Sequence, residues 1–306
     1  MLQYFHPKFL YDLFLRCHHD QEDLMNTFRY LSFLTTQHCL CDVLYVQIIH
    51  ELLMLLNQTH APLFFIKFIL MNIDFIKVPF SNNPSMQKYD GPLFNTNPNE
   101  KYLSEKQLQL EKYGEDLYGQ TEQFENSDLN QKVSQTLGLE ATESLFETAI
   151  KIEEDLAVMH NGKLEAICFC FPSGWIPGRE LKADLSKLHQ PVADNDLLLK
   201  SSEKLSQHMN KQTIRRWVWN VTTVPGLSNH PSEERPLLND FENLYFRLET
   251  QISTPLNESS SLFLVKVDVV PLKNVWDEVI LESINSMSED VLNYKNLSEI
   301  KKFLNS

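Results

Sequence analysis

The fold is decided at residues 164–175, which read Leu-Glu-Ala-Ile-Cys-Phe-Cys-Phe-Pro-Ser-Gly-Trp. The first eight of these residues are rich in strand formers, and the Pro-Ser-Gly run that follows ends a strand in a tight turn. The pair Asn161-Gly162 stands shortly before this strand, and such a pair favours a two-residue hairpin turn. Residues 155–160 are therefore the expected partner strand of a β-hairpin.

Two further stretches have the composition of long strands. In a strand over residues 216–224, successive side chains point to opposite faces, which places Trp217, Trp219 and Val221 on one face. Residues 261–270 are rich in Val, Leu and Phe and form the third long strand that the sequence predicts.

Helices are predicted wherever apolar residues recur at helical spacing. They cover residues 105–118, 129–137, 143–151, 181–188, 197–210, 275–287 and 290–304. Ser127 and Thr142 are the expected N-caps of the second and third of these helices. Arg247, Glu249 and Gln251 recur at every second position, which fits either a strand or the first turn of a helix. The sequence predicts an α+β domain, with a mostly antiparallel sheet and inserted and flanking helices.

The N-terminal part has a different character. Residues 79–100 contain four prolines among Asn and Ser, and are predicted to be an extended connector. Residues 1–78 are expected to be a helical apolar extension of unknown role, and residues 101–306 the main domain. Charged residues interrupt the extension too often for a membrane-spanning helix, so its helices are expected to pack on the main domain. Association with a membrane surface is a less favoured alternative.

Composition excludes several classes of function. The formal net charge is −14, which argues against a nucleic-acid partner, because phosphate binding depends on Lys and Arg. The five cysteines form no Cys-x-x-Cys pair, so a reducing, cytoplasmic location is expected. No glycine-rich phosphate loop is present, so any nucleotide reductant is expected to bind another polypeptide.

Four short motifs together resemble one family. They are Phe-Pro-Ser-Gly-Trp at 171–175, His-Gln-Pro-Val at 189–192, Arg-Arg-Trp at 215–217, and Arg-x-Glu-x-Gln at 247–251. In these motifs the chain resembles the haem-bearing alpha subunit of the haem-dependent oxidative N-demethylase family, over residues 88–272. The resemblance implies a PAS-like sheet within residues 101–306.

The resemblance also implies a haem b cofactor, with His189 as the axial ligand of the iron. A neutral imidazole is a good iron ligand, and Pro191 stiffens the backbone just after it. Trp175 and Phe171 are the implied contacts of the flat porphyrin. Without the resemblance, the commoner interpretation of a single histidine is a surface or core residue, and Trp175 caps the core.

The resemblance also implies roles for three charged residues. Arg247 is the implied partner of a haem propionate, Arg216 a second anion-binding residue, and Glu249 the residue that acts on an amine substrate. The alternatives are an exposed ion-pair network and solvated basic residues at a strand end. Thr250 stands where the family usually has Arg, and Ala183 where it tends to have Gly. These two departures put propionate or partner contacts, and catalytic competence, in doubt.

The implied function is haem-dependent oxidative N-demethylation of a small methylated amine such as dimethylamine. Dioxygen would be the oxidant, and electrons would come from a separate reductase that carries FMN and an iron–sulfur cluster and uses NADPH. The alternative is a non-catalytic PAS-like module that senses haem or another small ligand.

Overall fold

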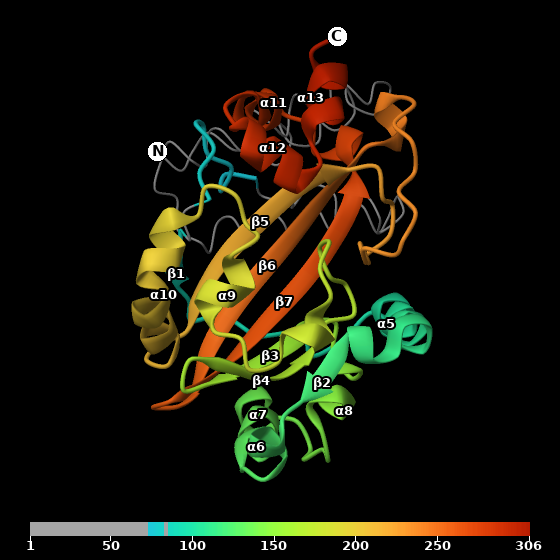
Figure 1. Cartoon of the computed structure of the whole chain (residues 1–306). Helices are drawn as coiled ribbons and strands as arrows, with labels where there is room; N and C mark the ends of the chain where they lie inside the picture. The colour runs from blue at the N-terminus through green and yellow to red at the C-terminus, as the bar shows by residue number, and fades with distance from the viewer. Residues whose placement is uncertain (1–72, 83–84) are drawn as a thin grey trace, which may run out of the picture. The chain divides into compact units, whose positions relative to one another are not determined.

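The computed structural model of this protein describes residues 73–82 and 85–306. The strands of this part are β1 (Gln87–Lys88), β2 (Tyr118–Gln120), β3 (Asp155–His160), β4 (Lys163–Cys168), β5 (Ile214–Thr222), β6 (Tyr245–Asn257) and β7 (Ser260–Pro271). They form one seven-stranded sheet in the order β1-β5-β6-β7-β3-β4-β2, with every neighbouring pair antiparallel. The predicted α+β class is confirmed (Figure 1), and the strand order is compatible with the PAS-like sheet that the resemblance implies.

The predicted hairpin at the start of the sheet forms as expected. β3 and β4 pair across Asn161 and Gly162, which both have positive φ values, of 50° and 77°. β4 ends at Cys168, earlier than the predicted 171, because the amides of Cys170 and Phe171 turn to donate to the Asp155 carboxylate. The segment around Arg247 is a strand of 13 residues, so the helical alternative for that segment is excluded.

The helices of the described residues are α5 (Glu100–Tyr113), α6 (Glu122–Glu125), α7 (Leu129–Leu137), α8 (Leu145–Ala149), α9 (Leu185–His189), α10 (Asp196–Met209), α11 (Glu278–Asn285), α12 (Glu289–Lys295) and α13 (Ser298–Leu304). Short 3₁₀ turns occupy Gly114–Asp116, Pro177–Glu180, Phe241–Asn243 and Leu272–Asn274.

Several helix boundaries differ from those predicted, for example at α9, which begins at Leu185 rather than 181. Three of the differences have a clear local reason. α5 begins at Glu100 rather than 105, because the Asn99 side chain accepts a hydrogen bond from the Lys101 amide. α8 is capped by Ser144, not by Thr142. The predicted helix over 290–304 is two helices, since Asn296 adopts a left-handed conformation, with φ of 56°, between them.

In the part of the chain that the structure describes, two buried clusters form the core. One contains the β3–β4 hairpin and the helices α7 and α8, and the other lies between the upper part of β5 and β6 and the C-terminal helices α11, α12 and α13. Residues before the sheet join the second cluster, since Ile76 is buried and the Phe75 ring stacks on Trp217 at 5.4 Å. The rest of the expected extension, residues 1–72, lies outside the described residues.

No helix among the described residues is both long enough and apolar enough to cross a bilayer. The small size of the helices around the sheet accounts for this, since the longest of those described, α5 and α10, each have 14 residues.

A fully buried ion pair connects α5 to the sheet. The Lys106 ammonium lies 3.4 Å from the Asp155 carboxylate, and neither side chain is accessible to solvent. Lys106 also donates to the carbonyls of Ala149 and Glu154, at 3.0 and 2.6 Å. Asp155 accepts from the amides of Cys170 and Phe171, at 3.0 and 2.9 Å. Burial raises the pKa of Asp155, and the Lys106 charge and the two amides oppose that rise.

Replacing Lys106 by Met is expected to destabilise the protein by roughly 3–5 kcal/mol, because the buried Asp155 carboxylate loses its cation. Lys101→Met is the matched control, since Lys101 lies on the same helix and is exposed. Urea denaturation measures the free energy of unfolding of both variants. A loss below about 1 kcal/mol for Lys106→Met would show that the pair does not hold α5 on the sheet.

Candidate functional site

One face of the central strands carries the polar residues. Arg247, Glu249 and Gln251 alternate along β6 on this face, and the register sets Gln251 opposite Arg216 and Glu249 opposite Val218 on β5. The other face of β6 carries core residues such as Phe246 and Leu248. We call the first of these the polar face of the sheet.

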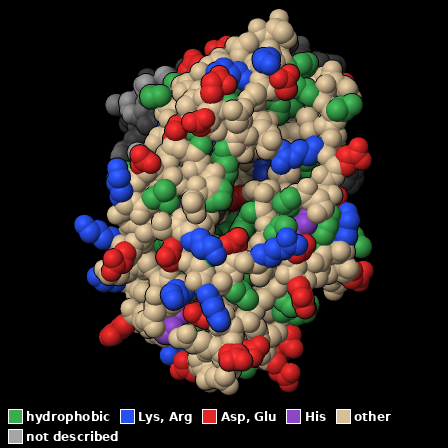
Figure 2. Space-filling model, viewed as in Figure 1, with side chains coloured by type: hydrophobic (Ala, Val, Ile, Leu, Met, Phe, Trp, Pro, Cys, Tyr) green, Lys and Arg blue, Asp and Glu red, His purple; other side chains and the backbone are tan. Residues whose placement is uncertain are grey.

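The polar face is hollowed in front of the central strands. In Figure 1, α9 lies over one side of β6 and the loop that follows β4 rises on the other side. Figure 2, in the same view, shows a hollow between them, over β6 and β7. Val218, Gln251 and Phe263 are only partly buried although they lie on interior strands of the sheet. Partial exposure at such central positions agrees with a face that no helix of the described residues packs against fully.

His189 is the last residue of α9, whose N-terminus is capped by the Asp184 side chain. Its Nδ1 lies 2.8 Å from the carbonyl oxygen of Leu185, one turn earlier. A carbonyl only accepts, so Nδ1 carries the hydrogen and Nε2 keeps a free lone pair. Burial lowers the pKa of His189, and the Arg216 charge lowers it further, while the bond to Leu185 acts against both. The imidazole is therefore neutral at pH 7 and has the form that binds a metal.

Arg247 is almost completely buried and is engaged by the protein itself. Its Nε donates to Ser173 Oγ at 2.9 Å, its Nη2 to the Phe171 carbonyl at 2.7 Å, and its Nη1 to the Leu227 carbonyl. Nη2 also lies 3.7 Å from Glu249. All three guanidinium nitrogens are thus occupied, so the geometry favours a clamp between loops and sheet over a propionate partner.

Arg216 has the opposite character. Among the described residues, none forms a hydrogen bond or an ion pair with its guanidinium. Burial lowers the pKa of Arg216, and the charge of Glu249 partly offsets this effect. A partly buried cation without a direct hydrogen bond or ion pair is suited to an anionic group of a ligand.

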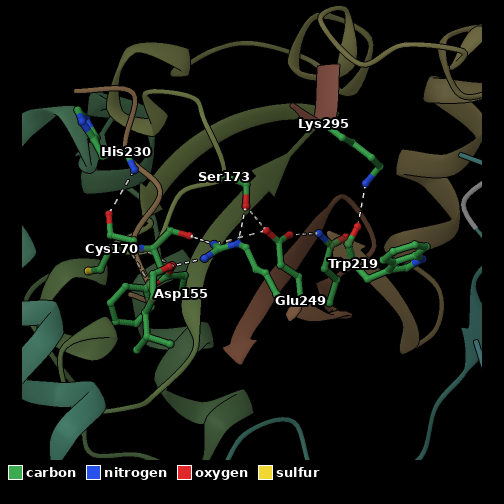
Figure 3. A network of polar contacts seen from close by, with 12 residues as sticks. Asp155, Cys170, Ser173, Trp219, His230, Glu249 and Lys295 are labelled. Carbon is green, nitrogen blue, oxygen red and sulfur yellow. Dashed lines mark hydrogen bonds and ion pairs between the residues drawn. The ribbon is translucent and has the colours of Figure 1, made fainter. Parts of the chain in front are cut away.

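Glu249 is held at both carboxylate oxygens. Ser173 donates to Oε1 at 2.5 Å and Gln251 donates to Oε2 at 2.8 Å. Figure 3 shows Ser173 and Glu249 pointing toward one another, with Asp155 farther along the same network.

Sequence reasoning missed Ser173 as a site residue, although it lies inside the Phe-Pro-Ser-Gly-Trp motif. It also missed Tyr294 on α12, whose pKa is raised by burial and then by the Glu249 charge, and no sequence pattern marks that residue.

The two aromatic candidates lie in different surroundings. The Phe171 ring is 2% exposed and packs edge-on against Tyr102, with ring centroids 6.3 Å apart. It therefore contributes its carbonyl, not its ring, to the polar face. Trp175 is partly exposed and packs edge-on against Phe169, which in turn stacks on Phe263. Trp175 both covers part of the core and keeps surface for a ligand.

A protein-family model described as "haem-dependent oxidative N-demethylase, alpha subunit-like" matches residues 107–304. The chain belongs to this family. The match includes all the predicted site residues, from Phe171 to Glu249. A search of curated proteins found no match.

The two departures from the family motifs do not fall on the polar face. Thr250 lies on the opposite side of β6. It lines a cavity of about 250 Å³, which is also lined by Tyr89, Glu154 and Lys266. Ala183 is buried, and its carbonyl accepts a hydrogen bond from the Leu164 amide. The hydrogen bonds of Glu249 and Ser173 involve Arg247 and Gln251, and neither Thr250 nor Ala183 takes part in them.

A larger cavity, of about 630 Å³, lies beside the edge strand β2. Acidic side chains line it, among them Glu115, Asp116 and Glu125, but no histidine or cysteine does. It offers no nitrogen or sulfur ligand to iron, which is why we place the candidate site at the hollow on the polar face.

The loop that supports Ser173 contains a buried histidine. His230 is 1% exposed and its ring stacks on Tyr113, with centroids 3.8 Å apart. The pKa of His230 is lowered by burial, against the charges of Asp116 and Glu233. Folded His230 therefore resists protonation more than the unfolded chain does.

Stability is expected to fall as the pH drops below about 6.5, because the unfolded chain then binds a proton that folded His230 does not. Urea denaturation at pH 7.5 and pH 5.5 gives the change in unfolding free energy. The change is expected to be smaller in His230→Gln than in the wild type and in His208→Gln, since His208 is exposed on α10. Equal changes in all three proteins would contradict the assignment to His230.

Proposed function

We propose that this protein binds haem in the hollow of the polar face, with His189 as the axial ligand, and oxidatively demethylates a small methylated amine. The observation that carries the proposal is the bond from His189 Nδ1 to the Leu185 carbonyl, which leaves Nε2 free and the ring neutral. Membership of the N-demethylase alpha-subunit-like family supports the same function.

The residues present fit a haem group. His189 would bind the iron through Nε2, and Arg216 would pair with a propionate, since its guanidinium has no other fixed partner among the described residues. Trp175 would contact the porphyrin face with the surface that its packing on Phe169 leaves open. Bound haem would supply the redox and dioxygen chemistry.

Glu249 would hold the substrate. A small methylated amine such as dimethylamine is cationic at neutral pH, and a carboxylate is its natural partner. Ser173 and Gln251 each hold one carboxylate oxygen, so the group faces a ligand in a fixed orientation. The products would be formaldehyde and the dealkylated amine.

Electrons would come from partner subunits. The family description names an alpha subunit, which supports a multi-subunit enzyme. We infer a reductase that carries FMN and an iron–sulfur cluster and takes electrons from NADPH, because the chain has no phosphate-binding loop of its own. The cysteine content fits a cytoplasmic location for this assembly.

Absorption spectra of the haem-reconstituted protein test the ligand. The wild type and His208→Ala are expected to share one Soret band, whereas His189→Ala shifts or loses it, because the iron loses its protein ligand. Oxidised and dithionite-reduced samples are both measured. An unaltered band in His189→Ala would disprove ligation by His189, and absence of haem binding by the wild type would disprove the N-demethylase function. Haem binding without amine turnover, in the presence of a reductant, would leave a sensor module.

Glu249→Gln keeps the side-chain shape but removes the charge that binds the amine. The dissociation constant for dimethylammonium, measured by calorimetry on the haem-loaded protein, is expected to rise by about 10–100-fold. The Soret band is expected to stay in place. Glu258→Gln, in the exposed turn between β6 and β7, is the control and should bind like the wild type. Unchanged binding by Glu249→Gln would place the amine elsewhere.

A further inference from the structure

We propose that Ser173 is a positioning residue for Glu249, and that it orients the carboxylate by donating a hydrogen bond whose direction Arg247 fixes. This inference rests on the function proposed above and explains how the Ser173 hydroxyl is itself oriented. It arises from three side chains on two separate parts of the chain, the turn after β4 and the strand β6.

The direction of the hydrogen bonds follows from their chemistry. Arg247 Nε can only donate, and it lies 2.9 Å from Ser173 Oγ, so the serine oxygen must accept there. The serine hydrogen is then available for Glu249 Oε1, at 2.5 Å. The carboxylate accepts, because an ionised carboxylate has no hydrogen to give. The order of donation is therefore Arg247 to Ser173 to Glu249.

The turn that carries Ser173 is anchored on two sides. On one side, the Gly174 amide donates to the Asn229 carbonyl at 2.9 Å, and the Asn229 amide donates to the Pro172 carbonyl at 3.0 Å. Gly174 has a φ of +81°, which a residue with a side chain rarely adopts. The position of Ser173 is thus set by its backbone neighbours on both sides.

On the other side, the turn is joined to the buried ion pair. Asp155 holds the amides of Cys170 and Phe171, and Arg247 holds the Phe171 carbonyl at 2.7 Å. These contacts lead from Asp155 through Phe171 and Arg247 to the Ser173 hydroxyl. Figure 3 shows Asp155 and Ser173 in one network. Ser173 itself is exposed, so its hydroxyl can be removed without opening a cavity in the core.

The consequence for the site concerns the two carboxylate oxygens. Gln251 holds Oε2, and Ser173 holds Oε1. Without the serine hydroxyl, the carboxylate keeps one donor and the more distant Arg247 at 3.7 Å, and it turns about its terminal bond. A bound ammonium ion then loses a preoriented partner.

The test compares Ser173→Ala with Ser173→Thr, which retains a hydroxyl, and with Ser232→Ala, an exposed serine in the neighbouring loop. The first measurement is calorimetric titration of the haem-loaded proteins with dimethylammonium. Ser173→Ala is expected to bind about tenfold more weakly, as for the loss of a hydrogen bond to a charged group. Ser173→Thr is expected to recover most of the affinity, and Ser232→Ala to match the wild type. The Soret band and the thermal midpoint serve as controls for the fold.

A second measurement does not depend on haem or on the amine. In protein labelled with ¹³C at the glutamate carboxyl carbon, the Glu249 signal is identified by its loss in Glu249→Gln. That signal is expected to move in Ser173→Ala and to return toward its wild-type position in Ser173→Thr.

The outcomes separate the two proposals. If the wild type binds amine and Ser173→Ala binds it equally well, with the Glu249 signal unmoved, the positioning role is disproved and the proposed function stands. If the wild type binds neither haem nor amine, the proposed function fails together with the role in amine binding. The carboxyl signal still decides in that case whether Ser173 orients Glu249.

Discussion

The fold and the candidate site both depend on one buried carboxylate. Asp155 begins β3, pairs with Lys106 of α5, and holds the two amides where the chain leaves β4. A buried charge is tolerated only when its cation and its hydrogen-bond donors are all present, so these three segments are fixed together. Because Phe171 gives its amide to Asp155 and its carbonyl to Arg247, the same constraint extends to β6 and the polar face.

The two faces of β6 have different roles: one packs in the core, and the other carries residues of the candidate site. Its even-numbered residues Phe246 and Leu248 belong to the core beneath the C-terminal helices, whereas Arg247 and Glu249 lie on the polar face. A slip of one residue in the pairing of β6 would turn charged groups into the core. The apolar residues on one side therefore enforce the register on which the polar side depends.

Much of the fold could be predicted from local signals. The Asn161-Gly162 turn and the alternation around Trp217 and Trp219 identified β3, β4 and β5, since these signals act within a few residues. β6 stayed ambiguous because charged residues occupy its outward positions. The state of Arg247 could not be predicted at all, because the Phe171 carbonyl that occupies it lies 76 residues away in the chain. From the sequence, Ser173 could be recognised only as a turn residue, because its partner Glu249 on β6 lies 76 residues away in the chain.

The pairing of β3 with β7 has a consequence for the order of folding. His160 and Ser260, which pair at one end of these strands, are 100 residues apart in sequence. Pairing between strands so far apart in sequence is slow, because closing the intervening loop costs conformational entropy before the stabilising contacts form. α9, with His189, is synthesised before β6 and β7, so the proposed iron ligand exists before the strands that lie under the hollow. Haem that meets the growing chain would find an imidazole but no pocket, and stable capture of the cofactor is expected only after the last strand has joined the sheet.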